Sequence, residues 1–247
     1  MAEKIFVAGA TGAIGTVLVP LLLDAGYVVY GSTRQQARAD PLKKLGAHPV
    51  VVDVFDAATL NAAVRAIAPA AIIHQLTDLP RLLEPQAMAE AVHRNARIRG
   101  EGTRNLVAAA LAAGSTRMIA QSIAWAYAGG NQRHVEESPL DVNAAGGRRI
   151  SIDGVVALET QVLHTPKLTG TVLRYGQLYG PGTSTMTPQG ASPVHVDAAA
   201  QAALLALQRG AVGIFNITGN NADVNNEKAG RVLGWDPAFR AARSIRS

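Results

Sequence analysis

Three evenly spaced glycines near the amino terminus could bind a phosphate-containing ligand. Gly9, Gly12 and Gly15 follow an apolar run at residues 5–8 and open a helical pattern over residues 12–24. Gly9 can take the positive φ of a tight turn, Gly12 lets the backbone approach a pyrophosphate, and Gly15 lets the helix lie close to the strand. The N–H groups at the helix start would face the phosphates. This context predicts a dinucleotide site, and the alternative is a strand-to-helix turn without a ligand.

The residues after the second predicted strand, 28–31, bear on the choice of cofactor. Sites that prefer NAD usually place Asp or Glu there, to accept from the ribose hydroxyls. This chain has Ser32, Thr33 and Arg34 instead, with Arg38 about one turn further on. A guanidinium suits a 2′-phosphate. We therefore expect NADP(H) in preference to NAD(H), unless Arg34 is only a solvent-exposed loop residue.

Strands and helices alternate along the chain and must position these groups. Further strands are predicted at residues 49–52, 70–74, 117–121, 169–174 and 213–217. Further helices are predicted at residues 41–45, 57–67, 85–113 (with a weak point at Gly100 and Gly102), 152–163, 197–209 and 225–233. Nearly continuous apolar strands indicate a parallel sheet covered on both faces, an α/β doubly wound (Rossmann) fold.

Ligands of such folds gather at the carboxyl ends of the strands. Residues 1–175 are predicted to form the dinucleotide-binding core, and residues 176–247 a small substrate-side lobe with one returning strand. The loop-rich stretches 129–147 and 180–192 lie where a substrate lobe is expected. Besides the glycines and arginines, the predicted cofactor contacts are Thr11, Ala13, Ile14, Thr33, Asp53, Val54, Gln75, Leu76, Thr77, Gln121, Tyr175, Gly176 and Leu178.

Composition narrows the possible classes. The chain has 247 residues, a formal net charge of +5 and no cysteine, which excludes disulfides and thiolate ligands. No His, Asp or Glu spacing suggests a metal site. Scattered arginines without interleaved aromatic residues argue against a nucleic-acid partner, whereas an anionic cofactor or substrate fits a mild positive charge. Without a membrane-spanning apolar run or room for a signal peptide before the first strand, we expect a cytoplasmic protein with no membrane partner.

Six segments in order carry a family resemblance. They are the glycine turn at 9–15, Asp53, Asn95 with residues 102–106, residues 121–123, residues 173–182 and residues 194–197. Together they resemble the short-chain dehydrogenase/reductase superfamily, and most closely its extended and atypical members, the NAD-dependent epimerase/dehydratases. The resemblance implies that Asp53 meets the adenine and that residues 173–182 pass the nicotinamide. It also implies possible dimerisation through the helices near 85–113 and 152–163.

The chain departs from this family at the catalytic pair. The family's Tyr-x-x-x-Lys lies eight and four residues before a glutamate that matches Glu159, and those positions hold Ser151 and Val155. In the family, the tyrosine is the proton donor or acceptor, and the lysine lowers its pKa and binds ribose. A serine without an adjacent base cannot replace a tuned phenol. The segment 182–193 is also shorter than the family's substrate-closing insertion.

Ser122 and Tyr127 are the remaining candidates for the catalytic groups. The resemblance implies that Ser122 polarises a substrate carbonyl, and Tyr127 could bring a phenol to the same pocket or be an ordinary half-buried loop residue. His74, His164 and His195 are expected to be structural, and Asp197 to cap a helix. The acids Glu136, Glu137 and Asp141 could touch substrate, although loop carboxylates are commonly solvated.

Two functions follow from these residues. In the first, the protein is an NAD(P)-dependent oxidoreductase or epimerase-like enzyme that acts on a small carbonyl, alcohol or sugar-type substrate. In the second, it is a dinucleotide-binding regulator or scaffold with little or no turnover. The missing Tyr/Lys pair favours the second function. The segments 121–123 and 173–182, which match the family, favour the first. Hydride transfer does not strictly need a phenol, because the cofactor carries the difficult step.

Overall fold

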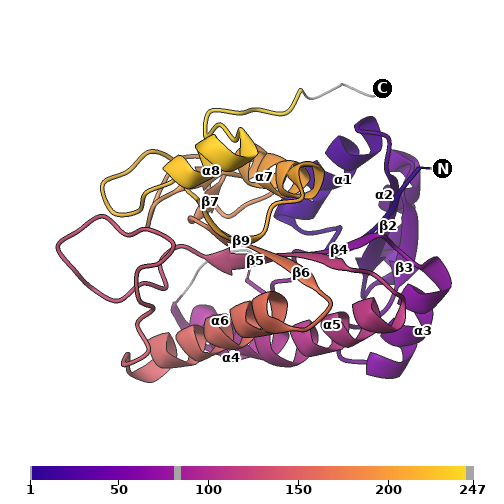
Figure 1. The fold of residues 1–247 in the computed structure, drawn as a ribbon, viewed down its shortest axis with the longest axis horizontal. Coiled ribbons are helices and arrows are strands. Elements are labelled where there is room, and N and C mark those ends of the chain that lie inside the picture. Colours follow the sequence, from indigo (N-terminus) through magenta and orange to yellow (C-terminus); the bar gives the residue numbers. More distant parts are fainter. Residues whose placement is uncertain (1, 81–84, 243–247) are drawn as a thin grey trace.

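A seven-stranded parallel sheet forms the centre of the computed structural model, which describes residues 2–80 and 85–242 (Figure 1). The strand order is β3-β2-β1-β4-β5-β6-β9. The strands are β1 (Lys4–Ala8), β2 (Val28–Thr33), β3 (His48–Val51), β4 (Ala71–His74), β5 (Arg117–Ile123), β6 (Thr169–Tyr175) and β9 (Gly213–Ile217). The order reverses between β1 and β4, which is where doubly wound folds bind ligands. The predicted fold class is confirmed.

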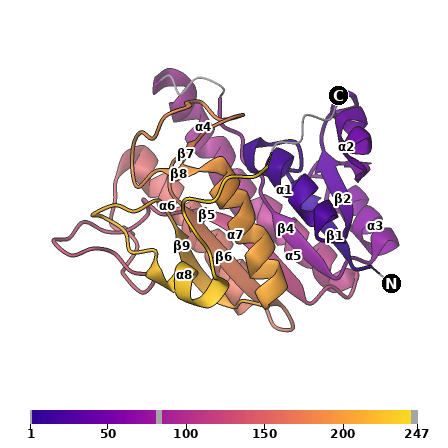
Figure 2. The ribbon, with the colours of Figure 1, turned by 90° about the horizontal axis from the view of Figure 1, so that it is seen from above.

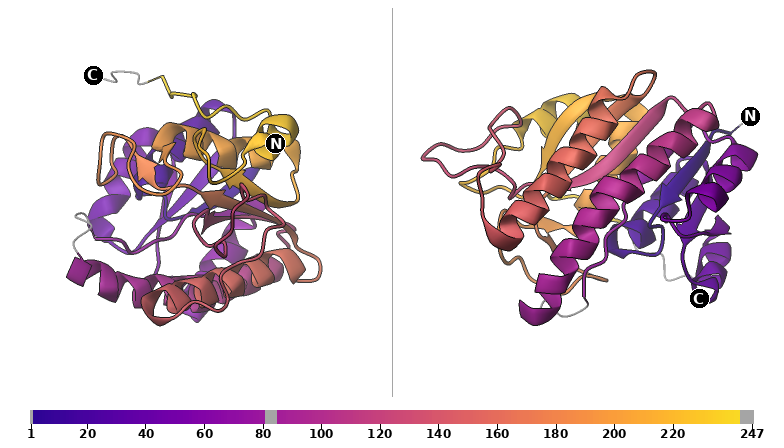
Figure 3. Two further views of the ribbon diagram at one scale, coloured as in Figure 1. Left: turned by 90° about the vertical axis from the view of Figure 1, so that its left-hand side faces the viewer. Right: turned by 90° about the horizontal axis from the view of Figure 1, so that it is seen from below.

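Helices cover both faces of the sheet (Figures 1 and 2). One face packs against α1 (Ala13–Asp24) and α7 (Val196–Arg209), with α8 (Glu227–Leu233) beside α7. The other face packs against α3 (Ala57–Ile67), α5 (Thr103–Ala112) and α6 (Gly146–His164), and α4 (Pro85–Arg97) lies beside α6. The right-hand view of Figure 3, which is seen from below, shows α4, α5 and α6 side by side in front of the sheet. A short helix, α2 (Ala39–Leu45), precedes β3.

Side-chain alternation within the strands divides the core into two clusters. In β1, Ile5 and Val7 join the cluster under α1 and α7, whereas Phe6 and Ala8 join the cluster over α3, α5 and α6. All four are at most 1% exposed. Burying a large apolar side chain stabilises a fold by roughly 1.5–3 kcal/mol. Strands buried on both faces therefore hold the carboxyl edge of the sheet rigid.

The long helical region predicted at residues 85–113 is interrupted at the predicted weak point. The helix α4 ends at Arg97, the segment η2 (Ile98–Gly102) is a π-helical turn, and α5 begins at Thr103. A Cβ on Gly102 would lie 3.4 Å from Val54 Cγ1, so the chain passes close to the segment after β3 here. Single π-turns of this kind occur mostly inside longer helices.

Two helix boundaries differ from the sequence prediction. The helix α6 begins at Gly146 and not at residue 152, and its first turns carry the ion pair of Arg149 and Asp153 at 2.7 Å. Asp197 does not cap α7. The cap is His195, whose Nδ1 accepts a hydrogen bond from Asp197 N at 3.2 Å. Asp197 lies in the first turn, where its carboxylate complements the positive end of the helix dipole.

The returning strand belongs to the main sheet. The strand β9 pairs with β6 in parallel, from Thr171↔Gly213 to Tyr175↔Ile217. Beyond the carboxyl edge, β7 (Leu178–Tyr179) and β8 (Val194–His195) form a separate two-stranded sheet. Loops 124–145, 176–195 and 218–226 cover this edge. Within the described ranges, no helix combines the length and apolar character that crossing a bilayer would need.

Candidate active site

The glycine turn connects β1 to the amino terminus of α1. Gly9 has a φ of +87°, in the left-handed region that favours glycine. Gly12 N donates to Gly9 O at 3.1 Å and closes the turn. Gly12 itself is exposed and extended, and α1 begins at the next residue. The first N–H groups of α1, next to Thr11, Ala13 and Ile14, have no helical carbonyl before them, which is the arrangement that binds phosphate.

Close packing at this turn leaves no space for side chains. A Cβ on Gly9 would lie 2.7 Å from Gln75 O, and a Cβ on Gly15 would overlap the Gly9 carbonyl and approach Ala10 C to 2.6 Å. Gly12, by contrast, faces outward, where a Cβ would meet only Gly9 O at 3.4 Å. The three predicted roles of turn, open approach and close helix packing therefore match the geometry of Gly9, Gly12 and Gly15 respectively.

The carboxyl end of β2 carries an arginine that reaches across to the loop after β4. Arg34 Nη2 lies 3.7 Å from Asp78 Oδ2, and Arg94 Nε on α4 lies 3.6 Å from the same oxygen. The Arg34 side chain is 53% exposed. Asn95 fixes Asp78 through its backbone, with 3.0 Å hydrogen bonds from Asp78 N and to Asp78 O. Arg94 Nη1 also lies 3.5 Å from Glu90 Oε2, so two guanidinium groups and two carboxylates form one chain of ion pairs that ends at Arg34.

The other residues predicted for the adenosine end lie at or after the ends of the neighbouring strands β2 and β3. Thr33 Oγ1 accepts from Gln35 N at 3.2 Å, and Arg38 is exposed at the end of the following 3-10 turn. Asp53 is exposed, and its Oδ1 accepts from Phe55 N at 2.9 Å. Val54 is buried, and its carbonyl accepts from the side chain of Asn105 at 2.9 Å.

The ends of β4, β5 and β6 form the middle of the site. Gln75 is 4% exposed, and its Nε2 donates to the Tyr175 hydroxyl at 3.5 Å. Gln75 Oε1 is buried without a hydrogen-bond partner among the described residues. Burial raises the pKa of Tyr175, so its phenol stays protonated. Gln121 Nε2 donates to Leu76 O at 3.3 Å, and Thr77 is exposed beside them.

Ser122 is turned to the opposite face of the sheet from Gln121. Its hydroxyl donates to Glu159 Oε1 on α6 at 2.8 Å, and Arg174 pairs with the same carboxylate through hydrogen bonds of 2.9 and 2.6 Å. Ser122 and Arg174 are register partners in β5 and β6. All three side chains are buried. Ser122 is thus part of a buried ion-pair network, and its catalytic role stays a prediction.

Tyr127 is held by a second group of buried contacts. Its hydroxyl donates to Asn216 Oδ1 at 2.6 Å, and Arg174 lies 4.9 Å from its ring centroid. Glu136 is 7% exposed and accepts a hydrogen bond from Asn216 N at 2.9 Å. Unlike most loop carboxylates, it is therefore buried. Burial is the main cause that raises the pKa of Tyr127, and Arg174 opposes it. The phenol therefore remains neutral at physiological pH.

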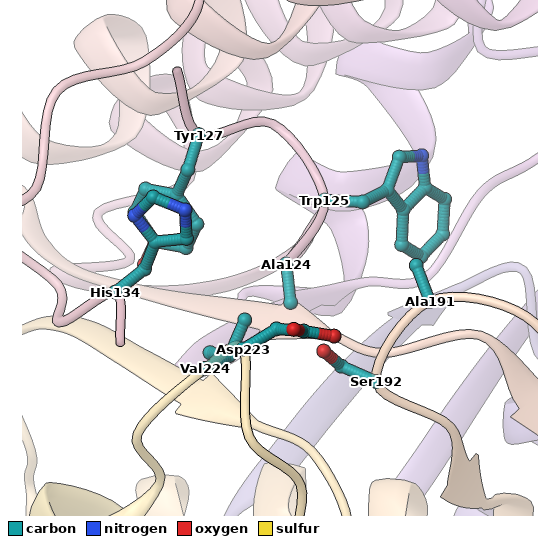
Figure 4. Close-up of a pocket in the computed structure, with 8 residues that line it drawn as sticks. All are labelled: Ala124, Trp125, Tyr127, His134, Ala191, Ser192, Asp223 and Val224. Carbon is teal, nitrogen blue, oxygen red and sulfur yellow. The ribbon is translucent and has the colours of Figure 1, made fainter. Parts of the chain in front are cut away.

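A cavity of about 170 Å³ opens beside Tyr127 (Figure 4). The lining residues come from three loops: Ala124, Trp125, Tyr127, His134, Ala191, Ser192, Asp223 and Val224. The His134 ring stacks on Tyr127 with centroids 4.9 Å apart. Ser122 is not among the lining residues, so the two predicted catalytic groups are separated: Tyr127 faces the cavity and Ser122 faces α6.

The loop after β6 connects this cavity to the predicted nicotinamide side. Ala124 N donates to Tyr175 O at 2.8 Å, and Gln177 N donates to Ala191 O at 3.1 Å. Gly176 lies so close to the carbonyl of Ser192 that no Cβ fits. The next residues, from Leu178 onward, pair with β8. The cavity therefore adjoins the ends of β5 and β6.

Comparisons with known proteins agree on one family. Residues 5–194 match the model of the NAD dependent epimerase/dehydratase family. The 3-diazoavenalumate denitrifying reductase of a Streptomyces species is 39% identical over 236 residues, which cover 87% of this chain and 75% of that protein. The chain belongs to the NAD dependent epimerase/dehydratase family. It is an NAD(P)-dependent enzyme of the oxidoreductase type.

Solved structures of this family's fold are similar over nearly the whole chain. UDP-glucose 4-epimerase of Thermotoga maritima, with UDP-glucose, has a TM-score of 0.75 at 19% identity and covers 96% of this chain and 94% of its own. Gre2 of Candida albicans, with NADPH, has a TM-score of 0.76 at 15% identity and covers 95% and 94%. At this identity the likeness shows the fold alone.

The residues present fit the dinucleotide of an epimerase/dehydratase. The glycine turn has an exposed helix start and a backbone cradle that a Cβ would fill. Gln75 Oε1 is a buried acceptor that a bound carboxamide or hydroxyl could satisfy. Two of the histidines expected to be structural have local structural contacts: burial, with Arg99 nearby, lowers the pKa of His74 to about 4, and His195 caps α7. His164 is exposed at the end of α6.

The positions of the family's Tyr and Lys are filled differently in this chain. Val155 is fully buried and packs with Ile123, Ala126 and Ile152 in a small apolar cluster, with Trp125 against it. Ser151, one turn earlier on α6, is half-buried. The helix α6 contains neither tyrosine nor lysine. Apolar packing therefore surrounds the position predicted to match the family's lysine, and the loss of the proton relay stays a prediction.

Sequence reasoning missed most of the cavity lining. His134 and Ser192 lie in the two stretches recognised as substrate-side loops, but neither was a candidate. Asp223 comes from the loop after β9, where Asn221 Oδ1 accepts from Asp223 N and Val224 N at 2.8 Å each. The abundance of asparagine between residues 216 and 226 could have indicated an ordered loop there.

Proposed function

We propose that this protein is an NAD(P)H-dependent reductase of a small electrophile whose reduction needs no proton from the protein, and that an aryl diazonium ion is such a substrate. The observation that carries the proposal is the apolar cluster around Val155. In the predicted match to the family, Val155 of this cluster takes the place of the lysine, and α6 carries no tyrosine. We infer a reaction that proceeds without that proton relay.

Possible substrates differ in whether their reduction consumes a proton in addition to the hydride. Reduction of a carbonyl adds a hydride to carbon and a proton to oxygen, so the enzyme must place an acid beside that oxygen. Reduction of a diazonium group, R–N₂⁺ + H⁻ → R–H + N₂, consumes only the hydride and releases neutral nitrogen. The relative at 39% identity is named a denitrifying reductase of a diazo compound. Protonation of a diazo group gives a diazonium ion, and this form fits the second balance.

The cofactor, when bound, supplies a hydride from its nicotinamide ring. We assign the pyrophosphate to the backbone around Gly12 and the start of α1, with Thr11, Ala13 and Ile14 as neighbours. Gln75, Gln121 and Tyr175 would orient the nicotinamide half, and Gly176 and Leu178 would follow its edge. Asp53 and Val54 would meet the adenine. Tyr127 would border the substrate, and Ser122 would act through Glu159 as a positioning residue.

We further propose a preference for NADP(H) over NAD(H). The support is Arg34 at the end of β2, whose side chain is 53% exposed, together with the exposed Arg38 about one turn further on. A 2′-phosphate carries negative charge that a second guanidinium can accept. The variant Arg34→Ala should weaken NADPH binding about tenfold, which corresponds to ~1.4 kcal/mol, and leave NADH binding nearly unchanged. Arg65→Ala, on the distant helix α3, is the control.

The test uses the full chain with NADPH, benzenediazonium and benzaldehyde in separate assays. We expect oxidation of NADPH in the first assay, with one N₂ and one benzene formed per cofactor, and none in the second. An assay without protein sets the uncatalysed rate. Reduction of benzaldehyde but not of the diazonium ion would contradict the proposal. Tight NADPH binding without turnover of either would favour the alternative, a dinucleotide-binding regulator.

A further inference from the structure

We propose that the cavity beside Tyr127 binds a flat, positively charged ring, with Trp125 selecting its shape and Asp223 selecting its charge. The inference rests on the proposed function and deepens it, because a diazonium group attached to a ring is such a cation. It names a substrate class for a site that adjoins the ends of β5 and β6.

Aromatic side chains stand on two sides of the cavity. Figure 4 shows Trp125 across the cavity from Tyr127, with His134 stacked on the tyrosine. Arg148 fixes both aromatic residues through the backbone, donating to Trp125 O at 3.1 Å and to Tyr127 O at 2.9 Å. Such walls favour planar ligands, and the face of an indole attracts cations.

The size of the cavity suits one ring. An apolar cavity of about 150 Å³ holds a benzene molecule in a well-studied engineered protein. The cavity here has a volume of about 170 Å³. Ser192 closes one side in the left-handed conformation, with a φ of +47°, and its hydroxyl donates to Asn221 Oδ1 at 3.1 Å. A nucleotide-linked sugar would extend well beyond this space.

The charge of the lining is negative. Asp223 is the acid among the lining residues, and none of them is lysine or arginine. Its backbone is fixed on both sides, because Asp223 O accepts from His134 N and Asp223 N donates to Asn221 Oδ1, both at 2.8 Å. Figure 4 shows the carboxylate beside the Ser192 hydroxyl at the cavity. The site is therefore poised for a cation and not for an anion.

Nearby cations are already paired with other acids. Arg148 lies 2.6 Å from Asp141, and Arg174 lies 2.6 Å from Glu159. Arg133 and Lys228 lie 3.9 and 3.6 Å from Glu227 and Glu137 respectively. None of these four basic residues lines the cavity. Asp223, which is exposed to solvent, is therefore the acid that lines the cavity without belonging to one of these pairs.

Three probes of one shape and different charge test the site by calorimetry: benzamidinium, benzamide and benzoate. The full chain is titrated with and without NADP⁺. We expect benzamidinium to bind at least about tenfold more tightly than benzoate, since an opposite charge within a few ångströms contributes on the order of this factor in a partly exposed site. Asp223→Asn should abolish the difference. Glu137→Gln, which removes a nearby acid outside the lining, should preserve it.

A second variant tests the shape selection. Trp125→Leu should weaken benzamidinium about tenfold, with little effect on acetamidinium, because only the flat ring loses its stacking partner. Equal binding of all three aromatic probes, or a preference that survives Asp223→Asn, would overturn the inference. These titrations need no turnover. A cation preference without diazonium reduction would contradict only the proposed function, and reduction without a cation preference would contradict only this site.

Discussion

The two ends of the carboxyl edge of the sheet are built in different ways. At β1, the site consists of backbone: three glycines, a helix start and packing too tight for a Cβ. At β5 and β6, it consists of side chains, and the neighbouring helix α6 carries Ser151 and Val155 where the family's Tyr and Lys are predicted. The comparison indicates that backbone geometry constrains the predicted cofactor-binding turn. The predicted reaction site at the ends of β5 and β6 can change through a few side-chain substitutions.

The largest expected effect is at the backbone end. Gly15→Ala should cost more than about 3 kcal/mol of unfolding free energy, or prevent folding, because the new Cβ would overlap the Gly9 carbonyl. Thermal unfolding measures this change. Gly129→Ala, where a Cβ meets nothing within 4 Å, should unfold like the parent protein. If Gly15→Ala were equally stable and bound NADPH normally, the backbone account of this end would be wrong.

The next effect concerns the ion pair beneath the other end. Glu159→Ala should reduce the unfolding free energy by about 3–5 kcal/mol, because it leaves the buried Arg174 without its carboxylate. Replacing both residues by methionine should recover most of this loss. Glu101→Ala, which breaks the exposed pair with Arg97, should leave the denaturation midpoint nearly unchanged. A similar loss in the single and double variants would contradict the ion-pair interpretation.

Restoring the family's catalytic pair tests the chemistry directly. Ser151→Tyr with Val155→Lys places an ammonium in the apolar cluster around Ile123, so we expect a destabilisation of several kcal/mol. Diazonium reduction should not become faster, because it needs no proton relay. The assay compares turnover of the double variant with that of Ser151→Tyr alone. A tenfold or larger gain in diazonium turnover would show that the parent enzyme lacks a group it needs.

The smallest effect is expected at Tyr127. Tyr127→Phe removes the 2.6 Å hydrogen bond to Asn216 and should cost about 1 kcal/mol of stability, with less than a threefold change in diazonium turnover. Because the pKa of Tyr127 is raised, its phenol stays protonated, and the parent rate should show no inflection from this group below about pH 10. A large loss of turnover in Tyr127→Phe, together with an inflection in the parent profile that the variant lacks, would identify Tyr127 as the proton donor.

Sequence patterns predicted the backbone end better than the side-chain end. The need for glycine at Gly9, Gly12 and Gly15 follows directly from backbone conformation and available space. Their spacing was therefore sufficient to predict the tight turn and the close packing of α1 on β1. Ser122 was placed near the substrate because its segment matched the family. Its position in β5 indicates that its side chain points toward α5 and α6, because Met118 and Ala120 share its face of the strand and pack there.

The cavity lining depended on contacts between distant segments. Asp223 lies after β9 and Tyr127 after β5, and only the pairing of β6 with both strands brings their loops together. The buried carboxylate of Glu136 accepts a hydrogen bond from Asn216 N, a residue 80 positions away. No local sequence pattern reveals this contact. Such pairings follow from the assembled sheet and not from spacing along the chain.

The solvent isotope effect on diazonium reduction tests the central claim most directly. Turnover of benzenediazonium with NADPH would be compared in H₂O and D₂O, with cofactor deuterated at the transferred position as the companion measurement. A proton-independent hydride transfer predicts a solvent effect near unity and a clear effect of the labelled cofactor. A large solvent effect with no effect of the labelled cofactor would contradict it.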